Sequence, residues 1–247
     1  MKKNYRKWIA YMCISPVLFV ANIFAEERPV PVNETPKKMN ISRYDETARG
    51  LNAPIYDYYA QRIKETTGIT KGVCLDVGSG GGYLGLSLAR ITNLDFIFLD
   101  ISVDALERAK QHIVEDGVQN RAKTLLADVH SIPLADGSMN LVISRGSIPF
   151  WKDPGLGLKE IYRVLAPGGK AYIGGGRGTP ELQAQLAEKR KTLGMESPER
   201  WKANKRRADR GPGQIPQRDY DGILKKTGIT NYSVSKGDDG IWIMMWK

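Results

Sequence analysis

The sequence predicts an α/β fold in which a mostly parallel sheet has helices on both faces. Three observations favour it: a glycine-rich turn follows an apolar run within residues 73–85, apolar runs alternate with helical patterns up to residue 173, and a hairpin pattern ends the chain. Such alternation is typical of parallel sheets, because each crossover between parallel strands needs a long connection, usually a helix. With 247 residues, 41% of them hydrophobic, the chain is long enough for one such domain and an insertion.

The individual elements follow from hydrophobic periodicity and from turn residues. Helices are predicted where apolar residues recur at helical spacing, at residues 53–67, 103–118, 181–193, 198–210 and 220–226. Strands are predicted for the apolar runs at residues 73–77, 96–100 and 140–144, for the run before Asp128 and for the run that ends at residue 173. A hairpin is predicted at residues 232–247, with its turn at residues 237–240.

The glycine-rich turn indicates a ligand site. Glycines there let a ligand approach the loop backbone and the N-terminus of the following helix. Residues 80–85 satisfy G-x-G-x-x-G, which is typical of dinucleotide binding, so a nicotinamide or flavin enzyme is one interpretation. Asp76 lies two residues before Gly78, the first glycine of the turn, where a carboxylate would repel a pyrophosphate but attract an ammonium or sulfonium group. The turn alone leaves both interpretations open.

Five segments in order resemble the motifs of class I S-adenosylmethionine-dependent methyltransferases, especially the small-molecule branch. They are the acid and three glycines at Asp76, Gly78, Gly80 and Gly82, the acids Asp100 and Asp128 after the second and third strands, and the fourth-strand and helix-turn segments at residues 140–144 and 160–170. The resemblance covers residues 55–173 and outweighs the single dinucleotide match. It implies a Rossmann-like, seven-stranded sheet, S-adenosylmethionine as cofactor, and methyl transfer to a small-molecule or lipid-like acceptor.

The resemblance also implies which residues bind the cofactor. The methionine portion would be approached by the loop of Gly78, Ser79, Gly80 and Gly82, and its ammonium would be oriented by Asp76. The ribose hydroxyls would be held by Asp100, and the adenine would be contacted by Ile101 on its face and by Asp128 and Val129 at its edge. Ser144 would lie beside the methyl group. Two of the acids have simpler alternatives: Asp100 could cap the next helix, and Asp128 could only form a turn.

The acceptor side departs from one branch of the family. Residues 144–147 are Ser-Arg-Gly-Ser rather than the Asn/Asp-Pro-Pro-aromatic motif that accompanies methylation of planar amino groups. Arg145 is the candidate for an acceptor carboxylate or phosphate, because a guanidinium forms a planar bidentate fork, although it could equally pair with a nearby acid. Trp151 would wall the pocket or simply pack.

No catalytic base can be assigned from the sequence. Only two histidines are present. His130 is expected at the surface or at the adenine rim, and His112, in the middle of a helix, is expected to be exposed. No metal-ligand spacing is present, so no metal site is predicted. A non-catalytic module that kept the cofactor pocket therefore stays an alternative.

The first 50 residues predict a leader and an arm. A basic head and an apolar run at residues 1–25 are typical of a signal peptide, and residues 8–25 approach the length of a membrane anchor. The domain is therefore expected to be exported or membrane-anchored, or cytoplasmic if the start codon is misassigned. Residues 26–50 are expected to form a linker and N-terminal arm, and residues 51–247 the methyltransferase domain.

Basic residues gather in a predicted insertion at residues 174–218. The net charge is +10, and much of it outside the leader lies at residues 189–191 and 200–210. The insertion could be a lid over the substrate, a face for anionic lipid headgroups or a solvated helix. Nucleic acid is not an expected partner, because Trp201 is the only aromatic residue of the basic run. The oligomeric state stays open.

Overall fold

The computed structural model describes residues 41–195 and 219–247. The predicted leader at residues 1–25 and the predicted basic helix at residues 198–210 lie outside these ranges, so both stay predictions. In the described part of the chain no helix has the length and apolar character needed to cross a membrane.

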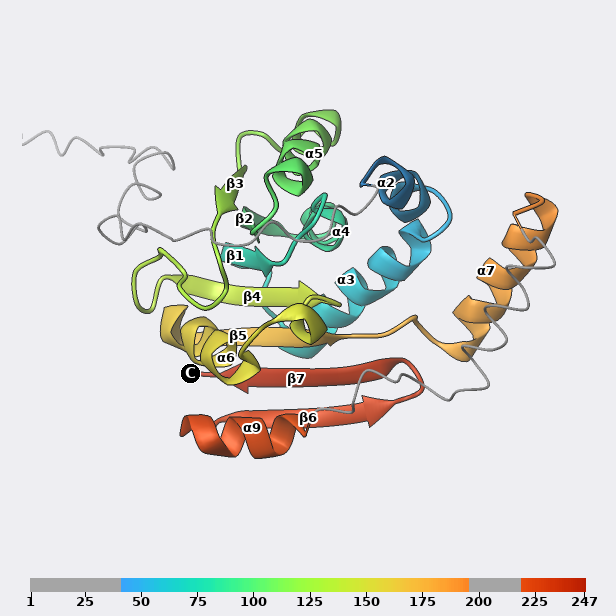
Figure 1. Ribbon diagram of the computed structural model, residues 1–247. Coiled ribbons are helices and arrows are strands. Elements are labelled where there is room, and N and C mark those ends of the chain that lie inside the picture. The colour runs from blue at the N-terminus through green and yellow to red at the C-terminus, as the bar shows by residue number, and fades with distance from the viewer. Residues whose placement is uncertain (1–40, 196–218) are drawn as a thin grey trace, which may run out of the picture.

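Seven strands form one sheet in the order β3-β2-β1-β4-β5-β7-β6 (Figure 1). The strands are β1 (Lys71–Val77), β2 (Asn93–Asp100), β3 (Ala122–Leu126), β4 (Met139–Arg145), β5 (Leu165–Gly175), β6 (Tyr232–Gly237) and β7 (Gly240–Trp246). Strands β1 to β5 pair in parallel, whereas β7 is antiparallel to both β5 and β6. The predicted fold class, a mostly parallel seven-stranded sheet with an antiparallel C-terminal hairpin, is confirmed.

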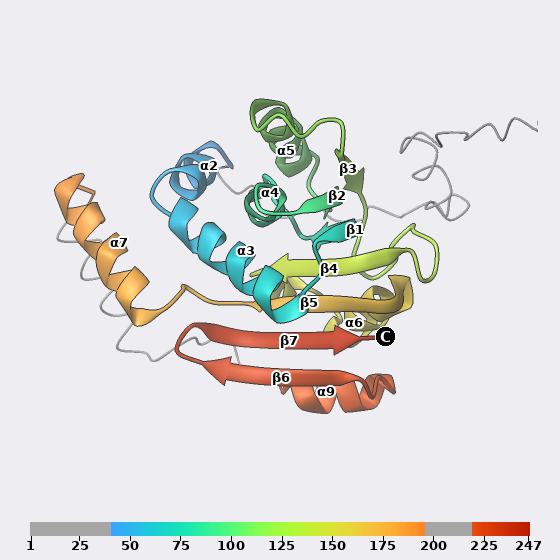
Figure 2. The same cartoon turned by 180° about the vertical axis from the view of Figure 1, so that it is seen from behind.

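Helices cover both faces of the sheet (Figures 1 and 2). They are α2 (Ile41–Arg49), α3 (Ala53–Thr67), α4 (Tyr83–Ala89), α5 (Val103–Glu115), α6 (Pro154–Val164), α7 (Pro180–Thr192) and α9 (Tyr220–Thr227), with a 3-10 turn, η1, at Ile148–Phe150. Alternate side chains of each strand point to opposite faces. Along β2, Phe96 and Phe98 enter the core beneath α3 and α4, whereas Ile97 and Leu99 enter the core beneath α6 and α9.

Helix α3 has the predicted bounds. A proline stands at its start, and Gly68 ends it in a left-handed conformation with φ of 70°, donating from its backbone N–H to the carbonyl of Lys64. Three tyrosines lie within four residues of this helix, and Tyr56 and Tyr59 are buried while Tyr58 is half-buried. Helix α3 therefore carries two buried phenol rings toward the carboxyl ends of the central strands.

Two helices lie in segments expected to be arm and insertion. Within the predicted arm, residues 41–49 form α2, which is tied to the end of α5 by an ion pair between Arg49 and Asp116, the C-cap residue of α5. Within the predicted insertion, α7 projects away from the sheet (Figures 1 and 2), and Leu186 is its one buried residue. Thr179 caps α7 by accepting a hydrogen bond from the backbone N–H of Leu182.

The loop between β3 and β4 is held by one side chain of α6. Arg163 donates to the carboxylates of Glu160 and Asp136 and to the carbonyl oxygens of Ile132 and Leu134. These carboxylates raise the pKa of the Arg163 guanidinium. A cation that donates to five oxygen atoms of four residues fixes the loop that carries Asp128.

Replacing Arg163 should destabilise the whole domain. We expect Arg163→Met to lower the free energy of unfolding by about 2–3 kcal/mol, because hydrogen bonds to charged groups are lost and loop carbonyls are left unpaired. Urea unfolding followed by circular dichroism measures this, with exposed Lys159→Met on the same helix as the control. Equal stability of the two variants would contradict the interpretation.

Candidate functional site

The site lies where the order of the sheet reverses. Strand β1 is flanked by β2 and β4, so the chain builds the sheet outward from β1 in both directions. In open α/β sheets, ligands bind outside the carboxyl ends of the strands at such a switch point. The loop between β1 and α4 is at that place, and the ends of β2 and β4 lie beside it.

The glycine loop is shaped by positive φ angles and by close packing. Gly78, Gly80 and Gly82 have φ angles of 64°, 56° and 81°. A Cβ on Gly78 would lie 2.4 Å from Cβ of Ser147, so the loop packs directly against the segment after β4. A Cβ on Gly80 would meet only the Tyr83 ring, at 3.7 Å. The loop backbone therefore lies tightly against the end of β4 and is open at Gly80.

Asp76 is a buried carboxylate behind this loop. The residue is 2% exposed, and its side chain accepts a hydrogen bond of 3.0 Å from the backbone N–H of Gly85. Burial raises the pKa of Asp76 to about 7, although the hydrogen bond from Gly85 opposes the shift and the nearby charge of Asp100 adds to it. A buried carboxyl of this kind favours a cationic group placed nearby.

Asp100 holds the loop and the start of α5 at once. Its Oδ2 accepts from the backbone N–H of Gly80 at 2.8 Å, and its Oδ1 accepts from that of Ser102 at 2.9 Å. The N-cap of α5 is Ser102, whose side chain accepts from Ala105 N–H, so Asp100 is not the helix cap. Burial raises the pKa of Asp100, and the backbone hydrogen bonds partly offset that effect. The adjacent Ile101 is 36% exposed.

Asp128 forms a turn and pairs with a histidine. Its Oδ1 accepts from the backbone N–H of His130 at 2.9 Å and lies 2.5 Å from Nδ1 of that ring. The other ring nitrogen, Nε2, accepts from the backbone N–H of Asp153 at 3.0 Å, which assigns the proton to Nδ1. His130 is half-buried and links Asp128 to the start of α6, while the side chain of Val129 is in the core.

Ser144 and Trp151 belong to one buried hydrogen-bond chain. Ser144 Oγ lies 2.5 Å from Ser147 Oγ, which accepts from Trp151 Nε1 at 3.1 Å. Ser147 Oγ also donates to the carbonyl oxygen of Val77 at the end of β1. The Trp151 ring packs against Gly157, where a Cβ would come within 2.9 Å. The structure thus places Ser144 and Trp151 in the packing between β1, β4 and η1.

Arg145 is the site's half-buried cation. Its Nη2 donates to the carbonyl oxygen of Gly176 at 2.7 Å. Its guanidinium carbon lies 4.9 Å from the centre of the Tyr56 ring and 5.3 Å from that of Tyr59. Its Nε is buried without a hydrogen-bond partner. In the described ranges no carboxylate lies within ion-pair distance of it, so the expected alternative of a nearby acid is not observed.

The expectation that His112 is exposed is wrong. The residue is 2% exposed and its Nδ1 lies 2.7 Å from the carbonyl oxygen of Gly81. Helix α5 buries Ala105, Leu106, Ala109 and Ile113 on the same face. His112 falls on that stripe three residues after Ala109, and this spacing was the signal that could have identified it. The structure also places three tyrosines beside the site for which the sequence predicted no role: Tyr56, Tyr59 and Tyr83.

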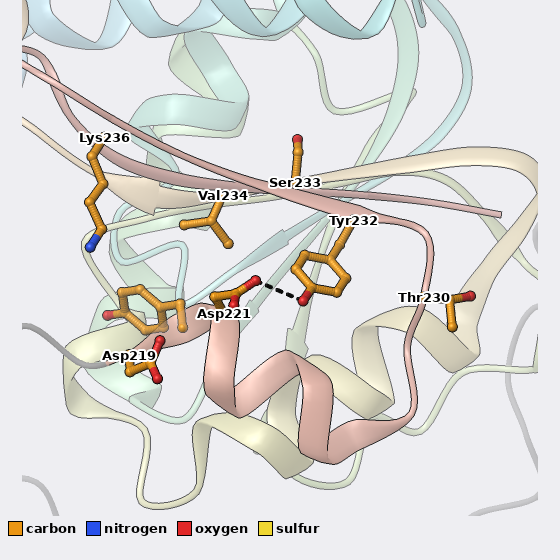
Figure 3. A pocket seen from close by; sticks show the side chains of 8 residues that line it. Asp219, Asp221, Thr230, Tyr232, Ser233, Val234 and Lys236 are labelled. Atoms are coloured by element: carbon orange, nitrogen blue, oxygen red, sulfur yellow. Dashed lines mark hydrogen bonds between the residues drawn. The ribbon is translucent and has the colours of Figure 1, made fainter.

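A separate groove lies at the far edge of the sheet, between α9 and β6 (Figure 3). Its volume is about 650 Å³, and it is lined by Asp219, Tyr220, Asp221, Thr230, Tyr232, Ser233, Val234 and Lys236. Asp221 accepts a hydrogen bond from Tyr232 across the groove and pairs with Lys225. None of the predicted site residues lines this groove. Among the residues that the structure describes, no three potential ligands are grouped to hold a metal ion.

Comparisons with known proteins give one consistent likeness. The sequence model of a family described as a methyltransferase domain matches residues 75–173. A crystal structure of a protein from Methanococcus maripaludis, assigned to the S-adenosyl-L-methionine-dependent methyltransferases, is similar with 34% identity and a TM-score of 0.73, over 87% of this chain and 96% of that one.

Two curated relatives share shorter segments. The ubiquinone/menaquinone biosynthesis C-methyltransferase of Geotalea daltonii is 31% identical over 53% of this chain and 57% of its own length. The 2-methyl-6-phytyl-1,4-hydroquinone methyltransferase 1 of Oryza sativa subsp. japonica is 34% identical over 40% of this chain and 29% of its own. This chain therefore spans less than two thirds of either curated relative.

Proposed function

The chain belongs to the class I S-adenosylmethionine-dependent methyltransferases, and on that premise we propose that it methylates a small-molecule or lipid-like acceptor whose anionic oxygen is bound by Arg145. The cofactor of the family is S-adenosylmethionine, which replaces the nicotinamide interpretation of residues 80–85. The observation that carries the acceptor proposal is the guanidinium of Arg145 at the end of β4, whose Nη2 donates to a backbone carbonyl and whose buried Nε has no hydrogen-bond partner.

The residues around the glycine loop fit this cofactor. The loop backbone is open at Gly80, and two carboxyl groups of raised pKa, Asp76 and Asp100, are next to it. A sulfonium ligand that also carries an ammonium complements buried carboxylates, whereas a pyrophosphate would be repelled. We assign the methionine portion to Gly78, Ser79, Gly80, Gly82 and Asp76, the ribose to Asp100, and the adenine to Ile101, Asp128 and Val129.

The chain's own task is orientation and exclusion of water. Bound S-adenosylmethionine supplies a methyl group already activated on a sulfonium for in-line displacement. The residues at the ends of β1 and β4 must therefore hold the acceptor in line and keep the site dry, which can lower the barrier by several kcal/mol. A general base is needed only where the acceptor must lose a proton of high pKa.

Arg145 can take the place of such a base. Its charge is balanced in the described structure by the faces of Tyr56 and Tyr59 and by the Gly176 carbonyl, not by an acid. An anionic oxygen at Arg145 would complete its hydrogen bonding, and the cation would lower the pKa of the acceptor hydroxyl or carboxyl. The acceptor would then meet the methyl group already ionised.

The relatives and one exposed ring favour a hydroxylated aromatic acceptor with an apolar part. The named substrate class of the Oryza sativa relative is a hydroquinone, and that of the Geotalea daltonii relative belongs to quinone biosynthesis. In this chain Phe150 follows β4 in η1 and is 86% exposed. An exposed ring at the end of β4 offers a contact for the apolar part of such an acceptor.

The test is methyl transfer from labelled S-adenosylmethionine to a panel of hydroquinones, phenols and carboxylic acids, using the full chain. We expect turnover on at least one ionisable acceptor and a loss of about 100-fold in kcat/KM in Arg145→Met, which corresponds to about 3 kcal/mol of charged hydrogen bonding. Cofactor affinity should stay within about threefold. Exposed Lys152→Met, from the adjacent loop, is the matched control.

The same assay separates the non-catalytic alternative. If the protein binds S-adenosylmethionine but transfers no methyl group to any acceptor of the panel, the binding-module interpretation gains support. If Arg145→Met and Lys152→Met behave alike on an accepted substrate, the role proposed for Arg145 is wrong.

A further inference from the structure

Three elements meet at the buried ring of His112. The ring comes from α5, and its Nδ1 lies 2.7 Å from the carbonyl oxygen of Gly81 in the glycine loop. Its Nε2 lies 3.1 Å from Oδ1 of Asp45, which belongs to α2. The side chain of Asp45 is 15% exposed and that of His112 only 3% exposed, so the contact is shielded from water. His112 thus stands between the cofactor loop and the N-terminal helix.

Both ring nitrogens face hydrogen-bond acceptors. A carbonyl oxygen only accepts, and so does a carboxylate. A neutral imidazole carries one N–H and one lone pair, so it can satisfy only one of these two oxygens. The imidazolium carries two N–H groups and satisfies both. We propose that His112 is a positioning residue whose imidazolium ties Gly81 of the cofactor loop to Asp45 of α2, so that docking of α2 and binding of the cofactor strengthen each other.

The groups around the bridge suit a charged ring. Asp45 Oδ1 also accepts from the Tyr83 hydroxyl at 2.8 Å, and Arg108 Nε lies 3.4 Å from Asp45 Oδ2. Burial raises the pKa of Tyr83, so the phenol stays neutral and acts as a donor. The titratable groups that face His112 and Asp45 are therefore Tyr83 from α4 and Arg108 from α5. Asp45 is the single anion of the group.

The bridge restrains the loop from one side while Tyr83 restrains it from another. A Cβ on Gly81 would lie 2.6 Å from the Tyr83 hydroxyl, so the peptide of Gly81 has little room to move. Tyr44 of α2 also lies with its ring centre 5.8 Å from that of Tyr83. Loss of the bridge would free the Gly81 carbonyl and loosen α2 together. This inference rests on the assigned cofactor and not on the acceptor proposed for Arg145.

Two variants separate the arms of the bridge. In His112→Asn the side-chain amide lies near the Nδ1 position and can keep the bond to Gly81, but it cannot reach Asp45. In His112→Gln the amide lies near the Nε2 position and can keep the bond to Asp45 but not the one to Gly81. Gln111→Asn, at the adjacent exposed position of α5, is the control.

Calorimetric titration of the full chain with S-adenosylmethionine from pH 6 to pH 8.5 gives the first readout. At pH 6 we expect both His112 variants to bind about 10-fold more weakly than the wild type, a typical coupling between two sites. Because only the imidazolium donates to both oxygens, we expect the ratio of the variant Kd to the wild-type Kd to shrink toward about twofold as the pH rises. Ionisation of Asp76 affects the wild type and the His112 variants alike, so it cancels from the ratio of their Kd values.

Hydrogen exchange of residues 41–49 in the ligand-free protein gives the second readout. At pH 6, exchange should be faster in His112→Asn, which loses the bond to Asp45, than in His112→Gln and Gln111→Asn. The wild type should approach His112→Asn as the pH rises. If the His112 variants fold poorly, Asp45→Asn replaces them, because it removes the anion at a partly exposed position. At pH 6 its residues 41–49 should exchange faster than those of the wild type, and the difference should shrink as the pH rises. An affinity ratio and an exchange difference that stay constant across the pH range would reduce His112 to a packing residue and overturn the proposal.

Discussion

Ligand-free Asp76→Asn should become more stable relative to the wild type as the pH rises. Asp76 has a folded-state pKa of about 7, raised by burial, against about 3.9 in an unfolded chain. Because the folded value is the higher one, the proton on Asp76 stabilises the fold at low pH, and this stabilisation is lost as the pH rises through about 7. About 3 kcal/mol of the stability difference between variant and wild type should develop between pH 5 and pH 8.

The asparagine removes this pH dependence while keeping an oxygen for the Gly85 N–H. Its amide group adds a cost to the free energy of unfolding that does not depend on pH. The informative quantity is therefore how the stability difference between variant and wild type changes with pH, and not the sign of that difference at one pH. Urea unfolding of protein stripped of S-adenosylmethionine at pH 5 and pH 8 measures it. Asp238→Asn, in the exposed hairpin turn, should show no such change. A difference for Asp76→Asn that is flat with pH would mean that Asp76 is already ionised in the free fold.

Much of the fold could be predicted because its signals are local. The bounds of α3 follow from a proline at its start and Gly68 at its end, and β2 follows from an apolar run that ends at Asp100. The antiparallel hairpin follows from turn residues between two short strands, and the structure puts its turn between Gly237 and Gly240. Each of these features is determined by residues a few positions apart in the chain.

The environment of the site residues could not be predicted, because it depends on contacts between distant segments. His112 was expected to be exposed because histidine is a polar residue. In the structure, however, hydrogen-bond acceptors from Gly81 and Asp45 offset the desolvation cost of burying its ring. The sequence placed Arg145 at the end of β4, yet Tyr56 and Tyr59, almost ninety residues earlier, surround it. The motif pattern thus identifies positions, while the tertiary contacts decide what each side chain can do.

Asp100→Ala should remove most of the cofactor affinity without unfolding the domain. The carboxylate is proposed to hold the ribose hydroxyls, and it also fixes the loop through the backbone N–H groups of Gly80 and Ser102. Two charged hydrogen bonds to the ligand and a loosened loop together are worth about 3 kcal/mol, so we expect the Kd for S-adenosylmethionine to rise about 100-fold or more. Calorimetric titration at pH 7.5 measures this, with exposed Asp104→Ala of α5 as the control.

Asp100→Asn separates the two contributions to that loss. The amide oxygen of asparagine can still accept one backbone N–H, but the side chain loses the charge and one acceptor position. If ribose binding dominates, S-adenosylmethionine and its demethylated product should weaken equally in both variants, because the two ligands share the ribose. If Asp100 acts only by shaping the loop, Asp100→Asn should recover most of the affinity that Asp100→Ala loses. Recovery to within about threefold of the wild type would therefore move Asp100 from ligand binding to loop support, and the ribose would need another partner.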